Sequence, residues 1–380
     1  MVPHIGVRIL SPEPRSRVAG SQGRRVAGLR GCQIGGPLPC VLCLLKVNKS
    51  IDKVTTKRMV LYSGRAHPEL AREVASHLNI SLGEADVVQF ANGEIRPRFG
   101  ESIRGGDVFI MQSHFGHNGH SINDAIMEQL IMIDAAYRAS AKRVTAVCPF
   151  YGYARQDRKA AGREPITARV VADMFKAAGS KRMVSVDLHS GQIQGFFDGP
   201  VDHLTAMPVL EKYLRDNARE GVVIVSPDTG RVKVAERFAQ HLADMNADVA
   251  FVYKRREKNS VNVASAKEVI GEVEGRLCVL TDDMIDTAGT ITSAAELLLA
   301  RGAKEVWAMA THGVLSDPAI ERLKKSSISR VVLTNTIPLA KEKRIDRIEV
   351  LSVAKIIADA LAAVFEETSV SELFGGENLA

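Results

Sequence analysis

The sequence predicts an α/β fold with two mainly parallel sheets, each flanked by helices. From Met59 onward, short β-branched apolar runs alternate with longer amphipathic runs, which is the pattern of a largely parallel sheet covered by helices. The strands expected from these runs are too many for one compact sheet of usual size, so we divide them between two sheets. The length of 380 residues and the hydrophobic content of 46% are sufficient for two cores.

Each expected strand is a short apolar run rich in Val, Ile or Leu, and each expected helix has apolar residues three and four positions apart. The strands are Met59–Ser63, Asp107–Gln112, Arg143–Cys148, Met183–Asp187, Val222–Ser226, Val249–Tyr253, Leu277–Thr281, Val306–Ala310, Arg330–Thr334 and Ile348–Leu351. The helices are Pro68–Leu78, Asn123–Ser140, Ile166–Ala178, Val209–Asn217, Val232–Asp244, Ile291–Ala300 and Val353–Phe365.

We divide the chain into four segments. Residues 1–57 form an Arg-rich, acid-poor leader, which we interpret as a disordered or non-native N-terminal extension, with a targeting signal as the alternative. Residues 58–200 and 201–345 form two similar domains, with the boundary near Pro200. Residues 346–380 hold a last strand and helix that are expected to pack back on the first domain.

The basic charge of the chain is concentrated in the leader. Residues 1–57 hold ten Lys and Arg residues against Glu13 and Asp52, so the total charge of +6 leaves residues 58–380 at −2. A nucleic-acid partner is therefore not expected. The five cysteines suggest no disulfide framework, which suits a reducing, cytoplasmic setting. No apolar run approaches the roughly 18 to 20 residues of a membrane span, so membrane insertion is not expected.

The stretch Leu277–Thr290 carries the clearest chemical signal. An apolar strand ends in the adjacent carboxylates Asp282 and Asp283 and continues through a small-residue turn into a helix that begins near Ile291. Ligands of open α/β sheets bind past the carboxyl ends of strands, and N–H groups at a helix N-terminus bind phosphate. The two carboxylates suit sugar hydroxyls. An acidic helix cap is the alternative, but it explains only one carboxylate, so we predict a phosphosugar site.

This loop resembles the phosphoribosyl pyrophosphate motif of the type I phosphoribosyltransferase fold, and five further segments narrow the resemblance to the ribose-phosphate pyrophosphokinases. The five segments are Phe90-Ala-Asn-Gly-Glu94, Tyr153-Ala-Arg-Gln-Asp-Arg-Lys159, Val186-Asp-Leu-His189, Ser226-Pro-Asp228 and Lys254-Arg-Arg256. They occur in the order of the family, and the resemblance covers roughly residues 58–377. Any one motif would be a weak signal, but several in order are a strong one.

The resemblance implies a fold, a reaction and a cofactor. Both domains would have the type I phosphoribosyltransferase fold, with ATP on the first and ribose 5-phosphate on the second. The β,γ-pyrophosphoryl group of Mg²⁺-bound ATP would move to the C1 hydroxyl of ribose 5-phosphate, giving 5-phosphoribosyl 1-pyrophosphate and AMP. That product serves purine, pyrimidine, NAD, histidine and tryptophan biosynthesis. The sequence has no G-x-x-x-x-G-K-[ST] motif, which argues against a P-loop kinase.

The resemblance also implies the role of each site residue. The ATP-binding set is Phe90, Asn92, Gly93, Glu94, Arg155, Gln156, Asp157 and Lys159. The set that binds ribose 5-phosphate is Arg256, Asp282, Asp283, Asp286, Thr287, Ala288, Gly289 and Thr290. The metal ligands would be His189, Asp228 and Asp187. Lys254 and Arg256 would be the catalytic cations, on a loop that closes over ATP.

The side chains suit these roles. Phe90 can offer adenine an apolar face, and Asn92, where the family usually has Asp, can hydrogen-bond the base or the ribose. His189 and Asp187 are two positions apart, so we expect them to face one side of an extended segment. Each role has a structural alternative: Phe90 and His189 could be core residues, the segment near Arg155 could be a solvated turn, and the segment after Tyr253 could be a mobile charged loop. Tyr253 and Glu257 depart from the family pattern around that loop.

The resemblance further implies a homohexamer regulated by inorganic phosphate and ADP. Ser102, Arg104 and the segment 334–336 match the family segments implicated in this regulation. Two other functions remain open. A phosphoribosyltransferase would explain the loop at 282–290 but not the other motifs. A non-catalytic regulatory subunit would be favoured by loss of Lys254, Arg256 or Asp228, and all three are present.

Overall fold

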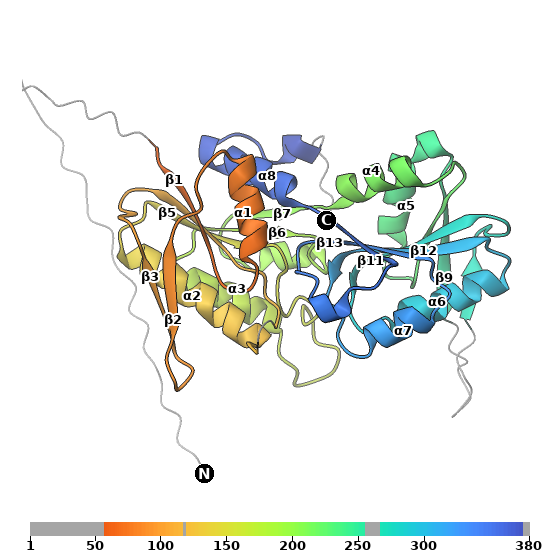
Figure 1. The fold of residues 1–380 in the computed structure, drawn as a ribbon, viewed down its shortest axis with the longest axis horizontal. Helices are drawn as coiled ribbons and strands as arrows, with labels where there is room; N and C mark the ends of the chain where they lie inside the picture. The colour runs from red at the N-terminus through yellow and green to blue at the C-terminus, as the bar shows by residue number, and fades with distance from the viewer. Residues whose placement is uncertain (1–56, 117–118, 255–266, 375–380) are drawn as a thin grey trace, which may run out of the picture. The chain divides into compact units, whose positions relative to one another are not determined.

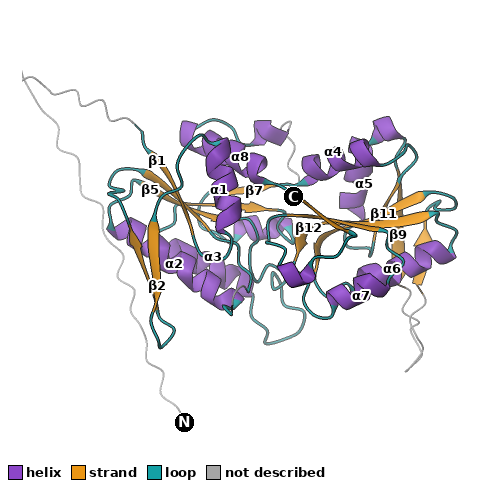
Figure 2. Ribbon diagram, viewed as in Figure 1, coloured by secondary structure: helices purple, strands orange, loops and turns teal. Residues whose placement is uncertain are grey.

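The computed structural model describes residues 57–116, 119–254 and 267–374 (Figure 1). All but the last residue of the expected N-terminal extension lie outside this part of the chain. The predicted α/β class is confirmed, because the described residues form two mainly parallel sheets with helices on both faces of each (Figure 2).

The first sheet has five strands, and each neighbouring pair is parallel. In sheet order the strands are β1 (Met59–Ser63), β4 (Asp107–Met111), β5 (Arg143–Cys148), β6 (Arg182–Val186) and β7 (Val201–Leu204). Side chains alternate between the two faces of a strand, and both faces of this sheet are buried. Tyr62 and Ile110 therefore enter one core, and Leu61 and Phe109 enter the other.

Two pairs of helices cover the first sheet. On one face lie α2 (Ile122–Arg138) and α3 (Thr167–Ala178), and on the other lie α1 (Pro68–His77) and α8 (Ala354–Glu366). Leu361 of α8 shares a core with Leu70 and Val74 of α1, although α8 follows the whole second sheet in sequence (Figure 1). Burial of these apolar side chains holds the C-terminal helix on the first sheet.

The second sheet has seven strands, and within it only the pairing of β9 with β10 is antiparallel. In sheet order the strands are β10 (Lys267–Ile270), β9 (Asp248–Lys254), β8 (Val223–Ser226), β11 (Leu277–Ile285), β12 (Glu305–Gly313), β13 (Arg330–Thr334) and β14 (Ile348–Leu351). One face is covered by α4 (Met207–Asn217) and α5 (Val232–His241), and the other by α6 (Gly289–Ala300) and α7 (Ala319–Lys325). Short 3₁₀ helices occur at Gly191–Gly195, Ala243–Met245, Lys341–Lys343 and Ser371–Phe374.

The structure adds elements that the sequence did not predict. The antiparallel hairpin of β2 (Ala85–Gln89) and β3 (Ile95–Phe99) pairs only with itself, and its half-exposed residues and Pro97 hide the apolar signal of a strand. The strands β7 and β10 and the helix α7 are short and were also missed.

The pairing of two strands places the segment boundaries differently from the sequence prediction. Because β7 pairs with β6, the chain leaves the first sheet after Leu204 rather than near Pro200. The last strand, β14, pairs with β13 of the second sheet, so only the helix after it lies on the first sheet. The domain limits remain predictions. None of the described helices combines the length and the apolar character that crossing a membrane requires.

Candidate functional site

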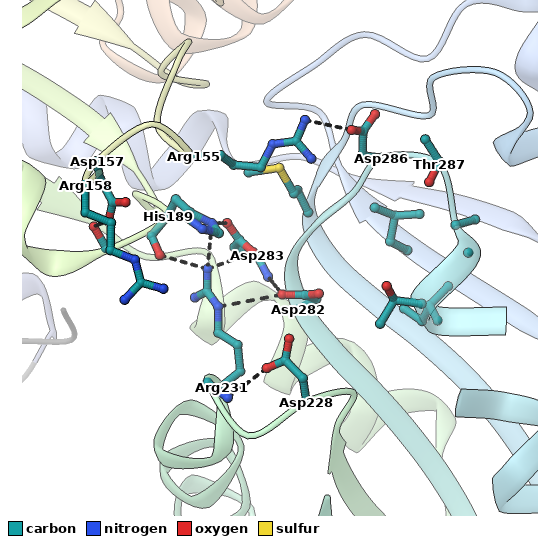
Figure 3. Close-up of a pocket in the computed structure, with 18 of the residues that line it drawn as sticks. Arg155, Asp157, Arg158, His189, Asp228, Arg231, Asp282, Asp283, Asp286 and Thr287 are labelled. Carbon is teal, nitrogen blue, oxygen red and sulfur yellow. Dashed lines mark hydrogen bonds and ion pairs between the residues drawn. The ribbon is translucent and has the colours of Figure 1, made fainter. Parts of the chain in front are cut away.

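A cavity of about 510 Å³, called the site cavity below, lies where residues that follow strands of both sheets meet (Figure 3). The first sheet contributes residues that follow β5 and β6, and the second contributes residues that follow β8 together with the end of β11 and the start of α6. The lining residues are Arg155, Asp157, Arg158, His189, Ser190, Gln192, Asp228, Gly230, Arg231 and the segment 282–291.

The predicted sugar carboxylates line the site cavity, but the strand does not end before them. Strand β11 continues to Ile285, because β12 is equally long and pairs with it at Asp282 and again at Met284. The expectation that Asp282 and Asp283 follow the strand is therefore wrong. The backbone of β11 is paired with β12 on both sides of Asp283, which fixes the positions of the two carboxylates more firmly than a loop would.

Asp282 and Asp283 have opposite electrostatic environments. Burial, together with the neighbouring carboxylate of Asp283, raises the pKa of Asp282 to about 8. Burial also opposes ionisation of Asp283, but the hydrogen bond to His189 and the charge of Arg231 outweigh it and hold its pKa well below the usual range. Oδ1 of Asp283 lies 2.7 Å from Arg231, and Oδ2 lies 2.7 Å from His189. The pair therefore favours a single negative charge, which is located on Asp283.

The loop Thr287–Thr290 has the geometry of an anion cradle. Ala288 precedes α6 in the left-handed conformation, with φ of 61°, and its side chain cannot cap the helix. The first N–H groups of α6 consequently lack a side-chain acceptor and carry the positive end of the helix dipole. Arg322 donates to the carbonyl of Thr287 at 2.9 Å, which fixes the loop from behind. This arrangement suits a phosphate group.

Some residues of the segment 153–159 line the site cavity, and some make hydrogen bonds within the protein. Arg155 reaches the second sheet and lies 2.8 Å from Oδ2 of Asp286. Asp157 lines the cavity but is buried, and it accepts hydrogen bonds from Ser190 at 2.5 Å and Gln192 at 2.7 Å. Asp157 therefore braces the loop that carries His189. Neither of the other two predicted residues, Gln156 and Lys159, lines the site cavity.

The predicted adenine residues are not brought to the site cavity within one chain. Phe90, Asn92, Gly93 and Glu94 form the turn of the β2–β3 hairpin, and none of them lines this cavity. Phe90 is not a core residue, because its side chain is 46% exposed and lies under the guanidinium of Arg96, 5.8 Å from the ring centroid.

The three predicted metal ligands also separate. His189 and Asp228 line the site cavity, whereas Asp187 does not. The expectation of an extended segment from 187 to 189 is wrong, because Asp187 has a φ of 38°. Its Oδ2 accepts hydrogen bonds from Ala206 N at 2.9 Å and from Thr311 Oγ1 at 2.6 Å. No group of three or more His, Cys, Asp or Glu residues arranged to hold a metal occurs in the described part of the chain.

The site cavity is lined by two cations that the sequence analysis missed, and the two predicted catalytic cations are not among its described lining residues. Lys254 is the last residue of β9, and Arg256 lies outside the described residues. Arg158 and Arg231 line the site cavity but were not assigned roles from the sequence. Arg158 stands inside the quoted Tyr153–Lys159 motif, and Arg231 stands three positions after Asp228. A search for cations near each predicted carboxylate would have found both.

Comparison with known proteins identifies the family. A model for the N-terminal domain of ribose phosphate pyrophosphokinase matches residues 59–179, and a model for a phosphoribosyl synthetase-associated domain matches residues 256–375. The ribose-phosphate pyrophosphokinase of Bifidobacterium longum is 54% identical over 86% of this chain and 96% of its own length. The chain belongs to the ribose-phosphate pyrophosphokinase family. The family and the enzyme class expected from the motifs are confirmed.

Further relatives give the same assignment. The ribose-phosphate pyrophosphokinase of Streptomyces coelicolor is 54% identical over 84% of this chain and 96% of its own length. The crystal structure of phosphoribosylpyrophosphate synthetase from Mycobacterium smegmatis is 51% identical, covers 82% of this chain and all of that one, and superposes with a TM-score of 0.76. The two family models include Arg155 and Asp282, while His189, Asp228 and Arg231 lie between them.

Proposed function

We propose that this ribose-phosphate pyrophosphokinase moves the β,γ-pyrophosphoryl group of ATP onto the C1 hydroxyl of ribose 5-phosphate. One observation carries the proposal: the loop Thr287–Thr290 after β11 of the second sheet and two arginines that follow β5 of the first sheet line the same cavity. That arrangement places a donor and an acceptor within reach of one another, which is the main requirement of phosphoryl transfer.

The acceptor side is built from β11 and α6. The loop Thr287–Thr290 would bind the 5-phosphate through its N–H groups, and Asp282, Asp283 and Asp286 would bind ribose hydroxyls. Carboxylates accept hydrogen bonds but repel phosphate, so the two groups of residues orient the sugar in only one direction. The C1 hydroxyl would then point away from the phosphate cradle.

The donor side is built from residues that follow β5. Arg155 and Arg158 line the site cavity and would neutralise the triphosphate. O1 of the sugar would attack the β-phosphorus, the bond from the β-phosphorus to the bridging oxygen would break, and AMP would leave with that oxygen. The proton of the C1 hydroxyl would pass to solvent. The predicted cations Lys254 and Arg256 would stabilise charge on the transferred group.

The residues of the cavity fit a Mg²⁺ ion that is held mainly by the nucleotide. Mg²⁺ usually takes one or two carboxylates together with water and substrate phosphates, and Asp228 offers such a carboxylate. His189 would be the second protein ligand, with Nδ1 bonded to Asp283 and Nε2 carrying the free lone pair. Bound Mg²⁺ would offset phosphate charge and polarise the phosphoryl group.

Assembly and regulation belong to the same proposal. The hairpin that carries Phe90 does not line the site cavity of its own chain, so a second copy of the chain would bring it to the adenine, as the expected homohexamer allows. Arg104 is exposed and bonds Ser140 at 3.3 Å, so it is accessible to a phosphate or ADP effector. Thr334 and Thr336 are buried, and both hydroxyls donate to the carbonyl of Thr311, so they would act only indirectly.

³¹P NMR of the purified chain with Mg²⁺, ATP and ribose 5-phosphate tests the reaction. We expect AMP and a C1-pyrophosphorylated sugar to appear at equal rates, and neither to appear when ribose replaces ribose 5-phosphate. Formation of ADP would indicate a γ-phosphoryl kinase. Binding of ATP without turnover would indicate a regulatory subunit, and either result would contradict the proposal.

A further inference from the structure

Arg231 occupies the centre of the site, although none of the motifs assigns it a role. It follows β8 and directly precedes α5, and its side chain is only 19% exposed. One of its terminal nitrogens lies 2.7 Å from Oδ1 of Asp283 and donates to the carbonyl of His189 at 3.0 Å. Its Nε lies 3.7 Å from Oδ1 of Asp282. Figure 3 shows the guanidinium between these three residues.

These contacts join residues that the backbone does not hold together. His189 follows β6 of the first sheet, whereas Asp282 and Asp283 belong to β11 of the second. A guanidinium that reaches both carboxyl groups fixes the direction of each. Asp282 also lines the site cavity, where its carboxyl group can hydrogen-bond a ligand.

Arg231 also lines the boundary between two cavities. A second cavity of about 240 Å³, called the side cavity, lies beside the site cavity, and both are lined by His189, Arg231, Asp282 and Asp283. The side cavity is further lined by apolar residues of α4 and α5, including Leu210 and Phe238. Shortening Arg231 would open one cavity into the other and would allow the carboxylates to turn away from the sugar site.

We propose that Arg231 is the positioning residue for ribose 5-phosphate: it orients Asp282 and Asp283 toward the ribose hydroxyls and aligns them with His189. This inference rests on the proposed function and deepens its acceptor side. Arg231 does not itself bind the transferred phosphoryl group, because its charge is already directed at Asp283, with Asp282 further off. The effect of removing it should therefore fall on the sugar and not on ATP.

The variants Arg231→Met and Arg231→Lys test the proposal by steady-state kinetics. Methionine keeps the apolar stem of the side chain but removes the guanidinium group. We expect the KM for ribose 5-phosphate to rise roughly ten- to a hundred-fold, as is typical when the partner that orients a ligating group is lost. The KM for ATP should not change. Lysine can reach one carboxylate but not two, so it should restore part of the loss.

The control is Arg215→Met on α4, which removes an arginine from an exposed ion pair with Asp244 at 3.1 Å, away from both cavities. We expect it to leave both KM values unchanged. Equal increases in the two KM values of Arg231→Met, or a fall in kcat with both KM values unchanged, would overturn the positioning role. Arg231→Lys keeps the charge and decides the matter if the methionine variant does not fold.

Calorimetric titration with ribose 5-phosphate separates the inference from the function on which it rests. If the wild-type chain made no 5-phosphoribosyl 1-pyrophosphate, the proposed function would fail, yet binding of ribose 5-phosphate could still be compared between wild type and Arg231→Lys. Weaker binding by the lysine variant supports the positioning role. Equal binding by the two proteins overturns it.

Discussion

His189 Nδ1 lies 2.7 Å from Asp283 Oδ2, although the two residues are 94 positions apart, His189 after β6 of the first sheet and Asp283 within β11 of the second. An ionised carboxylate only accepts hydrogen bonds, so Nδ1 of His189 is the donor, and in the neutral ring Nε2 keeps the lone pair. Asp283 is thus bonded to His189 on one oxygen and to Arg231 on the other. This contact couples the strand proposed to bind the sugar to the candidate metal ligand.

We predict that Asp283→Asn destabilises the protein far more than Asp282→Asn does at pH 7. Asp283 is buried and paired, and its replacement leaves Arg231 without a close carboxylate, which typically costs about 3–5 kcal/mol. Burial and the neighbouring Asp283 raise the pKa of Asp282, so its carboxyl keeps a proton more readily than an ordinary Asp and an amide is a closer replacement there. Urea unfolding of both variants measures the difference. Equal losses of stability would contradict the assignment of the charge to Asp283.

We predict that Ala288→Gly preserves the affinity for ribose 5-phosphate whereas Ala288→Val lowers it. Ala288 is buried and has a φ of 61°, a conformation that glycine adopts freely and that a β-branched residue strongly disfavours. With valine, the loop would leave this conformation and the N–H groups at the start of α6 would no longer converge on one phosphate. The KM for ribose 5-phosphate measures the effect, and ribose binding serves as the phosphate-free control. A valine variant with normal KM would show that the loop does not bind the phosphate.

We predict that the protein loses stability as the pH falls from 6.5 toward 4, in part because of His114. Burial lowers the pKa of His114 to about 4, its Nδ1 accepts from Gly152 N–H at 3.0 Å, and its Nε2 bonds Gln129 at 2.7 Å. The unfolded chain takes up a proton near pH 6.5 while the folded chain does not. The contribution is therefore present above 6.5 and is lost below it, at a cost on the order of 3 kcal/mol.

Urea unfolding at pH 7.5 and pH 5 tests this prediction. His114→Gln should show a smaller loss between the two pH values than the wild type, whatever its absolute stability. His77→Gln, at the exposed end of α1, is the control for removal of a histidine and should behave as the wild type does. The pKa values of His67, His203 and His312 are also lowered by burial, so part of the acid sensitivity should remain in His114→Gln. A ring of His114 that titrates near 6.5 by NMR would refute the argument.

The sequence predicted the sheets well because their strands are buried on both faces. Runs such as Val144–Cys148 are mostly apolar and buried throughout, and that signal is local. The β2–β3 hairpin was missed because it is half-exposed and contains Pro97. The true end of β11 was missed because it depends on pairing with β12, which is a contact between distant segments.

The candidate site divides in the same way. The residues of the segment Asp282–Thr290 were predicted because carboxylates, small residues and a helix start occur there in one continuous stretch. The position of Arg231 between His189 and Asp283 depends on how the two sheets meet, and no local spacing reveals it. Asp187 was misjudged because its positive φ cannot be read from neighbouring residues.

The dependence of activity on the Mg²⁺ concentration should distinguish Asp228 from Asp187, which were predicted together as metal ligands. Oδ1 of Asp228 accepts one hydrogen bond, from Gly230 N at 2.8 Å, and the residue lines the site cavity. Asp187 accepts two hydrogen bonds within the protein instead. We therefore predict that Asp228→Asn raises the Mg²⁺ concentration needed for half-maximal activity and leaves the free energy of unfolding nearly unchanged.

Thr311→Val is the matched test of Asp187, because it removes the hydroxyl that bonds this carboxylate and nearly preserves the shape of the side chain. A buried acceptor that loses its donor typically costs about 1–3 kcal/mol, so urea unfolding should show lower stability. The Mg²⁺ requirement should not move if Asp187 supports the contact between the sheets without holding the ion. If Thr311→Val shifts the Mg²⁺ titration as Asp228→Asn does, then Asp187 is linked to the metal after all and the division drawn between the two carboxylates is wrong.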